Sequence, residues 1–217
     1  MVVLISGRGS NMEAIVARSR QRGAAGRVVA VISDRPAAPG LARARELGVP
    51  AHSLSPREFS DRESFDEALA ELIDGFAPAV VALAGFMRIL SAGFVGRYTG
   101  RLLNVHPSLL PKYRGLDTHG RALAAGDLEH GASVHFVTEE LDAGPVVVQA
   151  RVPVIPGDTE ETLAARVQRV EHENYPAAVE LLASGRLELR AGGARLDGRS
   201  LAEPLTEHEI GTYACAS

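Results

Sequence analysis

Short apolar runs alternate with longer amphipathic stretches along the first half of the chain. Val2–Ile5 and residues 79–84 are wholly apolar, as expected of strands that are covered on both faces in a parallel sheet. Between them, residues 61–76 carry apolar side chains at helical spacing, and Asp61 near the start suits the helix dipole. This alternation of strand and helix predicts a doubly wound α/β fold. Further strands are predicted at residues 27–32, 49–54 and 101–106, and further helices at residues 11–22 and 40–47.

The pattern changes in the second half. Residues 133–138 and 146–154 are rich in β-forming residues, and the loop between them has no room for a crossover helix, so they should pair antiparallel. A long helix should begin near Asp158, with Pro176 interrupting and kinking it, and residues 186–196 should form a hairpin. The predicted fold is therefore Rossmann-like: a mostly parallel, twisted sheet flanked by helices, with antiparallel strands added in the second half.

Length and composition favour one domain. The 217 residues are 46% hydrophobic and 23% charged, which is the balance of a globular chain able to bury one sizeable core. No internal repeat or linker divides the sequence. We therefore expect one domain over residues 1–204, followed by a loosely ordered C-terminal tail over residues 205–217.

Charge, cysteine content and hydropathy argue against several classes of protein. No apolar run approaches the ~20 residues of a membrane span, and the chain opens without the basic segment of a signal peptide. The single cysteine, Cys215, excludes a disulfide framework and a thiolate zinc site, so a cytoplasmic location is expected. The net charge of −4, with Lys112 as the one lysine, argues against a nucleic-acid partner but not against small phosphates.

A glycine-containing turn, GRGSN, joins the first strand to the first helix at residues 7–11. Its glycines allow close approach to the backbone, and free N–H groups at a helix start attract an anion, so one interpretation is a phosphate site. A second interpretation is a dinucleotide site in which Asp34 binds the ribose, although Met12 occupies the position where that motif needs Gly or Ala. The third is a plain turn whose Ser10 or Asn11 caps the helix.

Two polar residues lie close together at the end of a predicted strand. Because side chains alternate along a strand, Asn104 and His106 should project from the same face, and Pro107 should keep His106 extended. Open α/β sheets bind ligands at the carboxyl ends of their strands. The pair is therefore a candidate site, and the alternative is a loop histidine beside a structural asparagine.

A further candidate is Asp142, although an aspartate in such a loop is most often a solvated turn residue. Together with His106, His119 and His135 it raises the possibility of a metal site. Their scattered spacing lacks an HExxH-type pattern, so we expect no metal. The chain also lacks the GxSxG and GxxxxGK[ST] motifs, which argues against a serine hydrolase and a P-loop nucleotidase.

Taken together, four segments resemble the phosphoribosylglycinamide formyltransferases of the 10-formyltetrahydrofolate-dependent formyltransferase family. These segments are GRGSN at residues 7–11, GFMRIL at 85–90, NVHPSLLP at 104–111 and LDAGP at 141–145. The similarity extends from Val2 to about Leu201. Arg8, Arg114 and Asp117 depart from the family pattern, and the tail after about Leu205 is unmatched.

This resemblance implies roles for individual residues. The implied catalytic residues are Asn104, His106 and Asp142. The implied site for the ribonucleotide phosphate consists of Ser10, Asn11, Met12, Gln168 and Glu171. The implied folate site consists of Arg62, Met87, Arg88, Ile89, Leu90, Asn104, Thr138, Glu139, Glu140, Leu141 and Asp142. In the family, the proline after the Leu109–Leu110 pair follows a cis bond, which here would be Leu110–Pro111.

The implied activity is direct transfer of the formyl group of 10-formyltetrahydrofolate to the amine of N1-(5-phospho-ribosyl)glycinamide. This reaction belongs to de novo purine (IMP) biosynthesis, uses the formyl folate as co-substrate and needs no metal. The implied protein acts on small molecules as a monomer or homodimer, without nucleic acid or membrane. The alternatives are an NAD-dependent oxidoreductase, a noncatalytic module that binds phosphosugars and, within the family, a hydrolase that releases formate.

Overall fold

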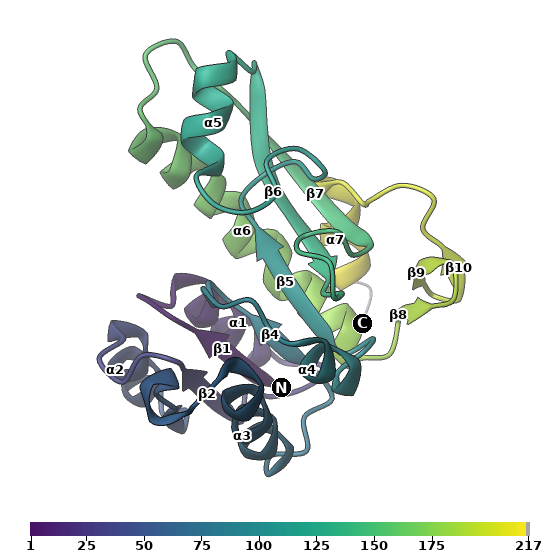
Figure 1. The fold of residues 1–217 in the computed structure, drawn as a ribbon. Helices are drawn as coiled ribbons and strands as arrows, with labels where there is room; N and C mark the ends of the chain where they lie inside the picture. Colours follow the sequence, from purple (N-terminus) through teal and green to yellow (C-terminus); the bar gives the residue numbers. More distant parts are fainter. Residues whose placement is uncertain (216–217) are drawn as a thin grey trace.

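A seven-stranded sheet runs through the protein in the order β3-β2-β1-β4-β5-β6-β7 (Figure 1). The computed structural model describes residues 1–215. Its first five strands are parallel, which confirms the α/β fold expected from the sequence. They are β1 (Val2–Ile5), β2 (Ala30–Ser33), β3 (Ala51–Ser53), β4 (Val81–Leu83) and β5 (Leu102–His106).

Helices cover both faces of this sheet, which explains why its central strands β1 and β4 are wholly apolar. On β1, Val3 and Ile5 belong to one core cluster, and Val2 and Leu4 belong to the other. The first cluster lies under α1 (Ser10–Ser19), α2 (Pro39–Glu46) and α6 (Glu160–Ala183), and the second lies under α3 (Arg62–Asp74) and α4 (Ala92–Arg97). Asp61 begins α3 as expected, since its carboxylate accepts a hydrogen bond from the Ser64 amide at 2.8 Å.

The second half adds antiparallel strands, also as expected. The strands β6 (Glu129–Phe136) and β7 (Val146–Pro153) pair antiparallel with each other, and β6 pairs antiparallel with β5. The connection from β5 to β6 contains α5 (Thr118–Ala125). Neither α5 nor α4 was expected, although the eight-residue α2 was. In such short helices the periodic pattern is weak. A 3₁₀ turn covers Pro56–Glu58.

The long helix α6 differs from the prediction at Pro176. It continues through this proline to Ala183 without interruption, although a proline inside a helix removes one backbone hydrogen bond and crowds the preceding turn. The preceding Tyr175 is fully buried, and its hydroxyl lies 3.0 Å from the Leu83 carbonyl oxygen and 2.9 Å from that of Leu103. The helix is thereby fastened to the sheet beside the ends of β4 and β5.

The C-terminal part forms a small second sheet and a docked helix. The predicted hairpin is confirmed as β8 (Leu187–Arg190) and β9 (Gly193–Leu196), with β10 (Arg199–Ser200) added. The expected loose tail differs, because Leu205 exchanges backbone hydrogen bonds with Val147 and Gln149 on β7. Ile210 of α7 (Glu207–Cys215) is also buried. This docking on the free edge of β7 is a long-range contact that no local pattern predicts; residues 216–217 of the expected tail lie outside the described residues.

Candidate active site

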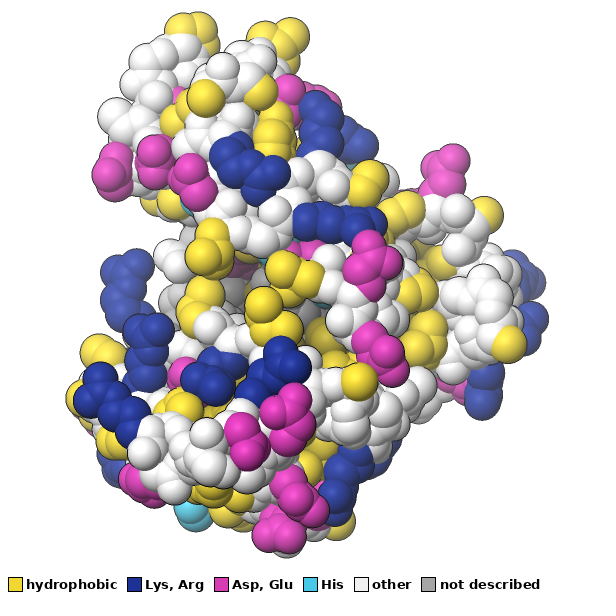
Figure 2. Space-filling model, in the orientation of Figure 1, with side chains coloured by type: hydrophobic (Ala, Val, Ile, Leu, Met, Phe, Trp, Pro, Cys, Tyr) yellow, Lys and Arg dark blue, Asp and Glu magenta, His cyan; other side chains and the backbone are white. Residues whose placement is uncertain are grey.

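A cleft of about 540 Å³ opens beside the carboxyl end of β5. It appears in Figure 2 as a hollow with hydrophobic side chains around its mouth. Of the large exposed apolar residues, Met87, Ile89, Leu116 and Leu141 line it. An apolar cleft with a few convergent polar groups is typical of a small-molecule site.

Asn104 and His106 lie on one face of β5 and line this cleft, as the strand alternation predicts. Leu103 and Val105 point the other way, into the core. The His106 ring is 7% exposed. The strand therefore fastens itself to the core with every second side chain and presents the others to the cleft.

The His106 ring lies between two hydrogen-bond acceptors. Its Nε2 is 2.8 Å from the carbonyl oxygen of Tyr113, and its Nδ1 is 3.4 Å from Oδ2 of Asp142. A carbonyl oxygen can only accept, so Nε2 carries a hydrogen. Oδ2 of Asp142 lies on the other side of the ring, where it can accept a hydrogen from Nδ1.

Asp142 is a buried partner of two histidines, not a solvated turn residue. Its side chain is 8% exposed, and Oδ2 also accepts a hydrogen bond from the Gly115 amide at 2.9 Å. Oδ1 lies 3.7 Å from Nε2 of His135. The backbone of Asp142 is left-handed, with φ of 49°, a conformation that is uncommon for residues other than glycine.

His135 is a site residue that the sequence placed only in a possible metal cluster. It faces Asn104 across β5 and β6, with Nε2 at 3.2 Å from Nδ2 of Asn104. Its Nδ1 lies 2.9 Å from the Phe136 carbonyl oxygen, and burial lowers the pKa of the ring. A neutral ring that donates from Nδ1 must accept at Nε2, so His135 fixes the orientation of the Asn104 amide. The only sequence signal for this role was the alternation of β6.

Buried polar contacts also hold the loop that carries Tyr113. Ser133, opposite His106 on β6, donates to the Ser108 carbonyl at 2.7 Å. The Ser108 hydroxyl donates to the Lys112 carbonyl at 2.6 Å, and the Gln149 amide donates to the Leu110 carbonyl at 2.6 Å. The sequence indicated neither Ser133 nor Gln149, because both act only through contacts between strands. The Leu110–Pro111 bond is cis, as the resemblance implied.

The possible metal cluster does not form. Within residues 1–215, no group of three or more His, Cys, Asp or Glu side chains is placed to hold a metal ion. His119 lines the cleft, but its Nδ1 is paired with Nε2 of His130 at 3.1 Å. Burial lowers the pKa of both rings, that of His130 to about 4. The two rings are therefore neutral and are joined by one hydrogen bond.

The glycine turn and the late helix meet as the resemblance implied. The Gln168 amide donates to the Ser10 hydroxyl at 3.0 Å, and the Asn11 amide donates to Glu171 at 2.8 Å. The Met12 side chain is fully buried in the core, so it does not reach the surface of the turn. Gly9 has φ of 80°, and the Gly40 amide donates to the Gly7 carbonyl at 3.0 Å. These contacts fix the turn beside the start of α1.

The structure separates the expected folate residues into two groups. Nine of them line the cleft: Met87, Arg88, Ile89, Leu90, Asn104, Thr138, Glu139, Leu141 and Asp142. Arg62 and Glu140 are not among the lining residues. Arg62 is exposed at the start of α3 and pairs with Glu63, whereas Glu140 pairs with Arg114 at 2.6 Å.

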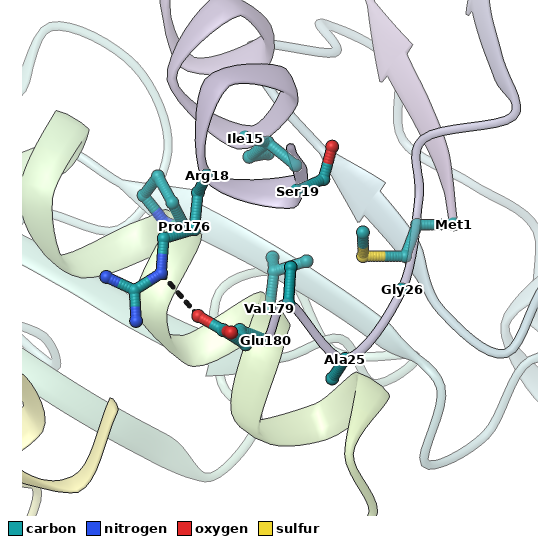
Figure 3. Close-up of a pocket in the computed structure, with 10 residues that line it drawn as sticks. Met1, Ile15, Arg18, Ser19, Ala25, Gly26, Pro176, Val179 and Glu180 are labelled. Carbon is teal, nitrogen blue, oxygen red and sulfur yellow. Dashed lines mark hydrogen bonds and ion pairs between the residues drawn. The ribbon is translucent and has the colours of Figure 1, made fainter. Parts of the chain in front are cut away.

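A second cavity is too small for a substrate. It measures about 10 Å³ and lies between α1 and α6, where Ile15 and Val179 face each other and Arg18 pairs with Glu180 (Figure 3). Such a volume holds at most one water molecule. The cleft beside β5 is therefore the candidate active site.

Known proteins share the fold and much of the sequence. The family model described as formyl transferase matches residues 1–179. The chain belongs to the formyl transferase family. It is 54% identical over 201 residues to phosphoribosylglycinamide formyltransferase of Escherichia coli K12, across 93% of this chain and 95% of that protein. The enzyme of the same name from Haemophilus influenzae is 41% identical with the same coverage. The structure of phosphoribosylglycinamide formyltransferase from Coxiella burnetii, with CHES bound, is 49% identical, with a TM-score of 0.89 over 94% of this chain and 97% of that one.

Membership in the formyl transferase family argues against the dinucleotide interpretation of the glycine turn. That interpretation needs Asp34 to face a ribose, whereas Asp34 is 7% exposed.

No helix among residues 1–215 is long and apolar enough to cross a membrane.

The buried carboxyl of Glu171 makes stability depend on pH. Burial raises its pKa from 4.5 to about 6, and the hydrogen bond from Asn11 opposes this only in part. The folded state therefore bears the cost of a buried charge above pH 6, and none below pH 4.5 where the carboxyl is protonated in both states. Glu171→Gln keeps an acceptor for Asn11, so it should gain about 2 kcal/mol over the parent as pH rises across this range. Chemical denaturation of the parent and the variant below pH 4.5 and above pH 6 measures the two free energies of unfolding. A difference between them that does not change with pH contradicts the prediction.

Proposed function

We propose that this chain transfers the formyl group of 10-formyltetrahydrofolate to the amine of N1-(5-phospho-ribosyl)glycinamide. The products are the N-formyl ribonucleotide and tetrahydrofolate, in de novo purine (IMP) biosynthesis. The observation that carries the proposal is the buried group of His106, Asp142, His135 and Asn104 in an apolar cleft. Its members can donate to an oxyanion and accept a proton, which is the requirement of acyl transfer to an amine.

The reaction proceeds through a tetrahedral intermediate. The amine nitrogen attacks the formyl carbon, and the carbonyl π electrons move to oxygen to form an oxyanion. The nitrogen then loses a proton. As the carbonyl forms again, the bond from carbon to N10 breaks and N10 gains a proton, which yields tetrahydrofolate. No covalent bond to the protein is needed.

Asn104 is the first donor to the oxyanion. One of its amide hydrogens is directed to His135 Nε2, which leaves the other for the cleft. His106 is the second donor, and its Nε2 hydrogen must exchange the Tyr113 carbonyl for the oxyanion. The Asn104 amide is fixed before the reaction and needs no reorganisation as charge develops, which makes it the more effective of the two donors.

Asp142 acts on the amine side. It holds His106 in position, and it helps to remove the amine proton, through a water molecule. Its burial between His106 and His135 supports this role, because a shielded carboxylate interacts more strongly with nearby charge than an exposed one.

The two substrates approach from different elements. The turn at Ser10 and Asn11, with Gln168 and Glu171, takes the ribonucleotide phosphate and ribose side. The formyl folate lies along the nine cleft residues given above, and Arg62 and Glu140 would reach it only at its outer end. We also propose that the enzyme works in the cytoplasm, as a monomer or homodimer, which sedimentation at several concentrations distinguishes.

An assay with both substrates tests the function. The purified protein should transfer formyl to the ribonucleotide without added metal or nicotinamide, and tetrahydrofolate should appear in equal amount. Release of formate at a rate that ignores the amine would identify a hydrolase instead. Binding of the ribonucleotide without turnover would identify a phosphosugar-binding module.

A variant of the glycine turn can be compared with a matched control. A side chain at Gly9 would stand 3.1 Å from Met12 and 3.3 Å from the Gly40 backbone with φ at 80°, whereas one at Gly7 would meet nothing within 4 Å. Gly9→Val should therefore raise KM for the ribonucleotide by about tenfold or more and leave KM for the folate nearly unchanged. Gly96→Ala, at an exposed position on α4 where a side chain also meets nothing within 4 Å, is the control and should change neither. Equal rises for both substrates would place the phosphate elsewhere.

The pairing of Asp142 with His106 is tested by a double-mutant cycle. Asp142→Asn keeps the shape but removes the charge, so kcat should fall by about 10²–10⁴. Adding Asp142→Asn to His106→Ala should cost little more than His106→Ala alone, because the two residues act as a unit. Thermal melts confirm folding. Fully additive losses would show that Asp142 does not act through His106.

A further inference from the structure

One wall of the cleft, residues 87–90, has no regular secondary structure. Its side chains alternate, with Met87 and Ile89 at 62% and 59% exposed and Leu90 buried. Among the described residues, no hydrogen bond uses the backbone amides or carbonyls of residues 88–90. These backbone groups are available to a ligand. The contacts that hold the segment in place therefore determine how a ligand binds there.

Two buried side chains hold the segment at its ends. The hydroxyl of Ser6, just after β1, accepts a hydrogen bond from the Met87 amide at 2.8 Å. The carboxylate of Asp66, on α3, accepts one from the Ser91 amide at 2.6 Å. Ser6 and Asp66 are 3% and 2% exposed. Between these two contacts, the backbone groups of residues 88–90 make no hydrogen bond among the described residues.

A buried aspartate such as Asp66 lowers the stability of the fold. A buried carboxylate is costly unless its oxygens are satisfied, and a well-packed apolar residue is often more stable there. Yet Oδ1 of Asp66 has no hydrogen-bond partner among the described residues. The neighbouring Phe65 supports the same segment, since its ring lies 4.6 Å from the Arg88 guanidinium. One turn of α3 therefore contacts the segment twice.

We propose that Asp66 is a positioning residue for the folate side of the cleft. By fixing the Ser91 amide, and with Ser6 fixing the Met87 amide, it sets the free backbone groups of residues 88–90 at the spacing that recognises the folate ring system. The inference rests on the proposed function. Asp66 itself does not line the cleft.

The test compares substrates across variants of the full chain. Asp66→Ala removes the acceptor, so KM for 10-formyltetrahydrofolate and Kd for tetrahydrofolate should rise about tenfold or more, as for a lost charged hydrogen bond. KM for the ribonucleotide should stay within about twofold. Asp66→Asn retains an oxygen that can accept from Ser91, so it should restore most of the affinity. Ser6→Ala should weaken folate binding in the same direction.

Asp74→Asn is the matched control. Asp74 lies on the same helix and bonds to Tyr98 and Arg97 of the α4 region, without contacting residues 87–91. This variant should leave both KM values unchanged. Two results would show that Asp66 is merely structural and would overturn the proposal. One is that Asp74→Asn changes the KM values as much as Asp66→Ala does, and the other is that Asp66→Ala raises both KM values equally.

Two further outcomes separate the inference from the proposed function. Unchanged tetrahydrofolate affinity in a folded Asp66→Ala overturns the positioning role while formyl transfer by the parent stands. If Asp66→Ala does not fold, unchanged affinity in Ser6→Ala overturns it. A parent protein that neither transfers formyl nor binds tetrahydrofolate overturns the proposed function itself.

Discussion

The candidate site depends on the alternation of side chains along β5. Leu103 and Val105 are buried in the core under α6, and this fixes the strand rigidly. Asn104 and His106 must then face the cleft, because neighbouring side chains on a strand point to opposite faces. A shift of one residue in register would bury both polar groups and expose the apolar pair. The same packing that stabilises the sheet therefore fixes the catalytic face.

Around this face the protein maintains a costly polar arrangement. His106, His135 and Asp142 are nearly buried, and each depends on another for a hydrogen-bond partner or counter-charge. Tyr113 and Asp142, which contact His106, both have left-handed backbones, with φ of 55° and 49°. Backbone strain of this kind persists only where the surrounding contacts enforce it, and it concentrates at functional sites. The arrangement orients the Asn104 amide before a substrate arrives, and it holds the His106 ring beside it.

The two ends of the proposed site rest on different parts of the fold. The glycine turn is held by α6 through Gln168 and Glu171, whereas the wall at residues 87–90 is held by Ser6 and by Asp66 on α3. These helices lie on opposite faces of the sheet. The reacting group on β5 lies between them. Ser6 directly precedes the glycine turn, so the two substrate sides also meet at the end of β1.

The sequence by itself determined what is local: the apolar strands, the α3 periodicity, the Asn104–His106 face and the motifs that indicate the formyl transferase family. It did not determine the contacts between distant segments. The partnership of Asp142 with His106 and His135, the docking of Leu205 on β7 and the passage of α6 through Pro176 were decided by tertiary packing. A local pattern shows which face of an element a side chain takes, whereas burial and hydrogen-bond partners are supplied by segments that are distant in the sequence. Only the folded chain brings those segments together.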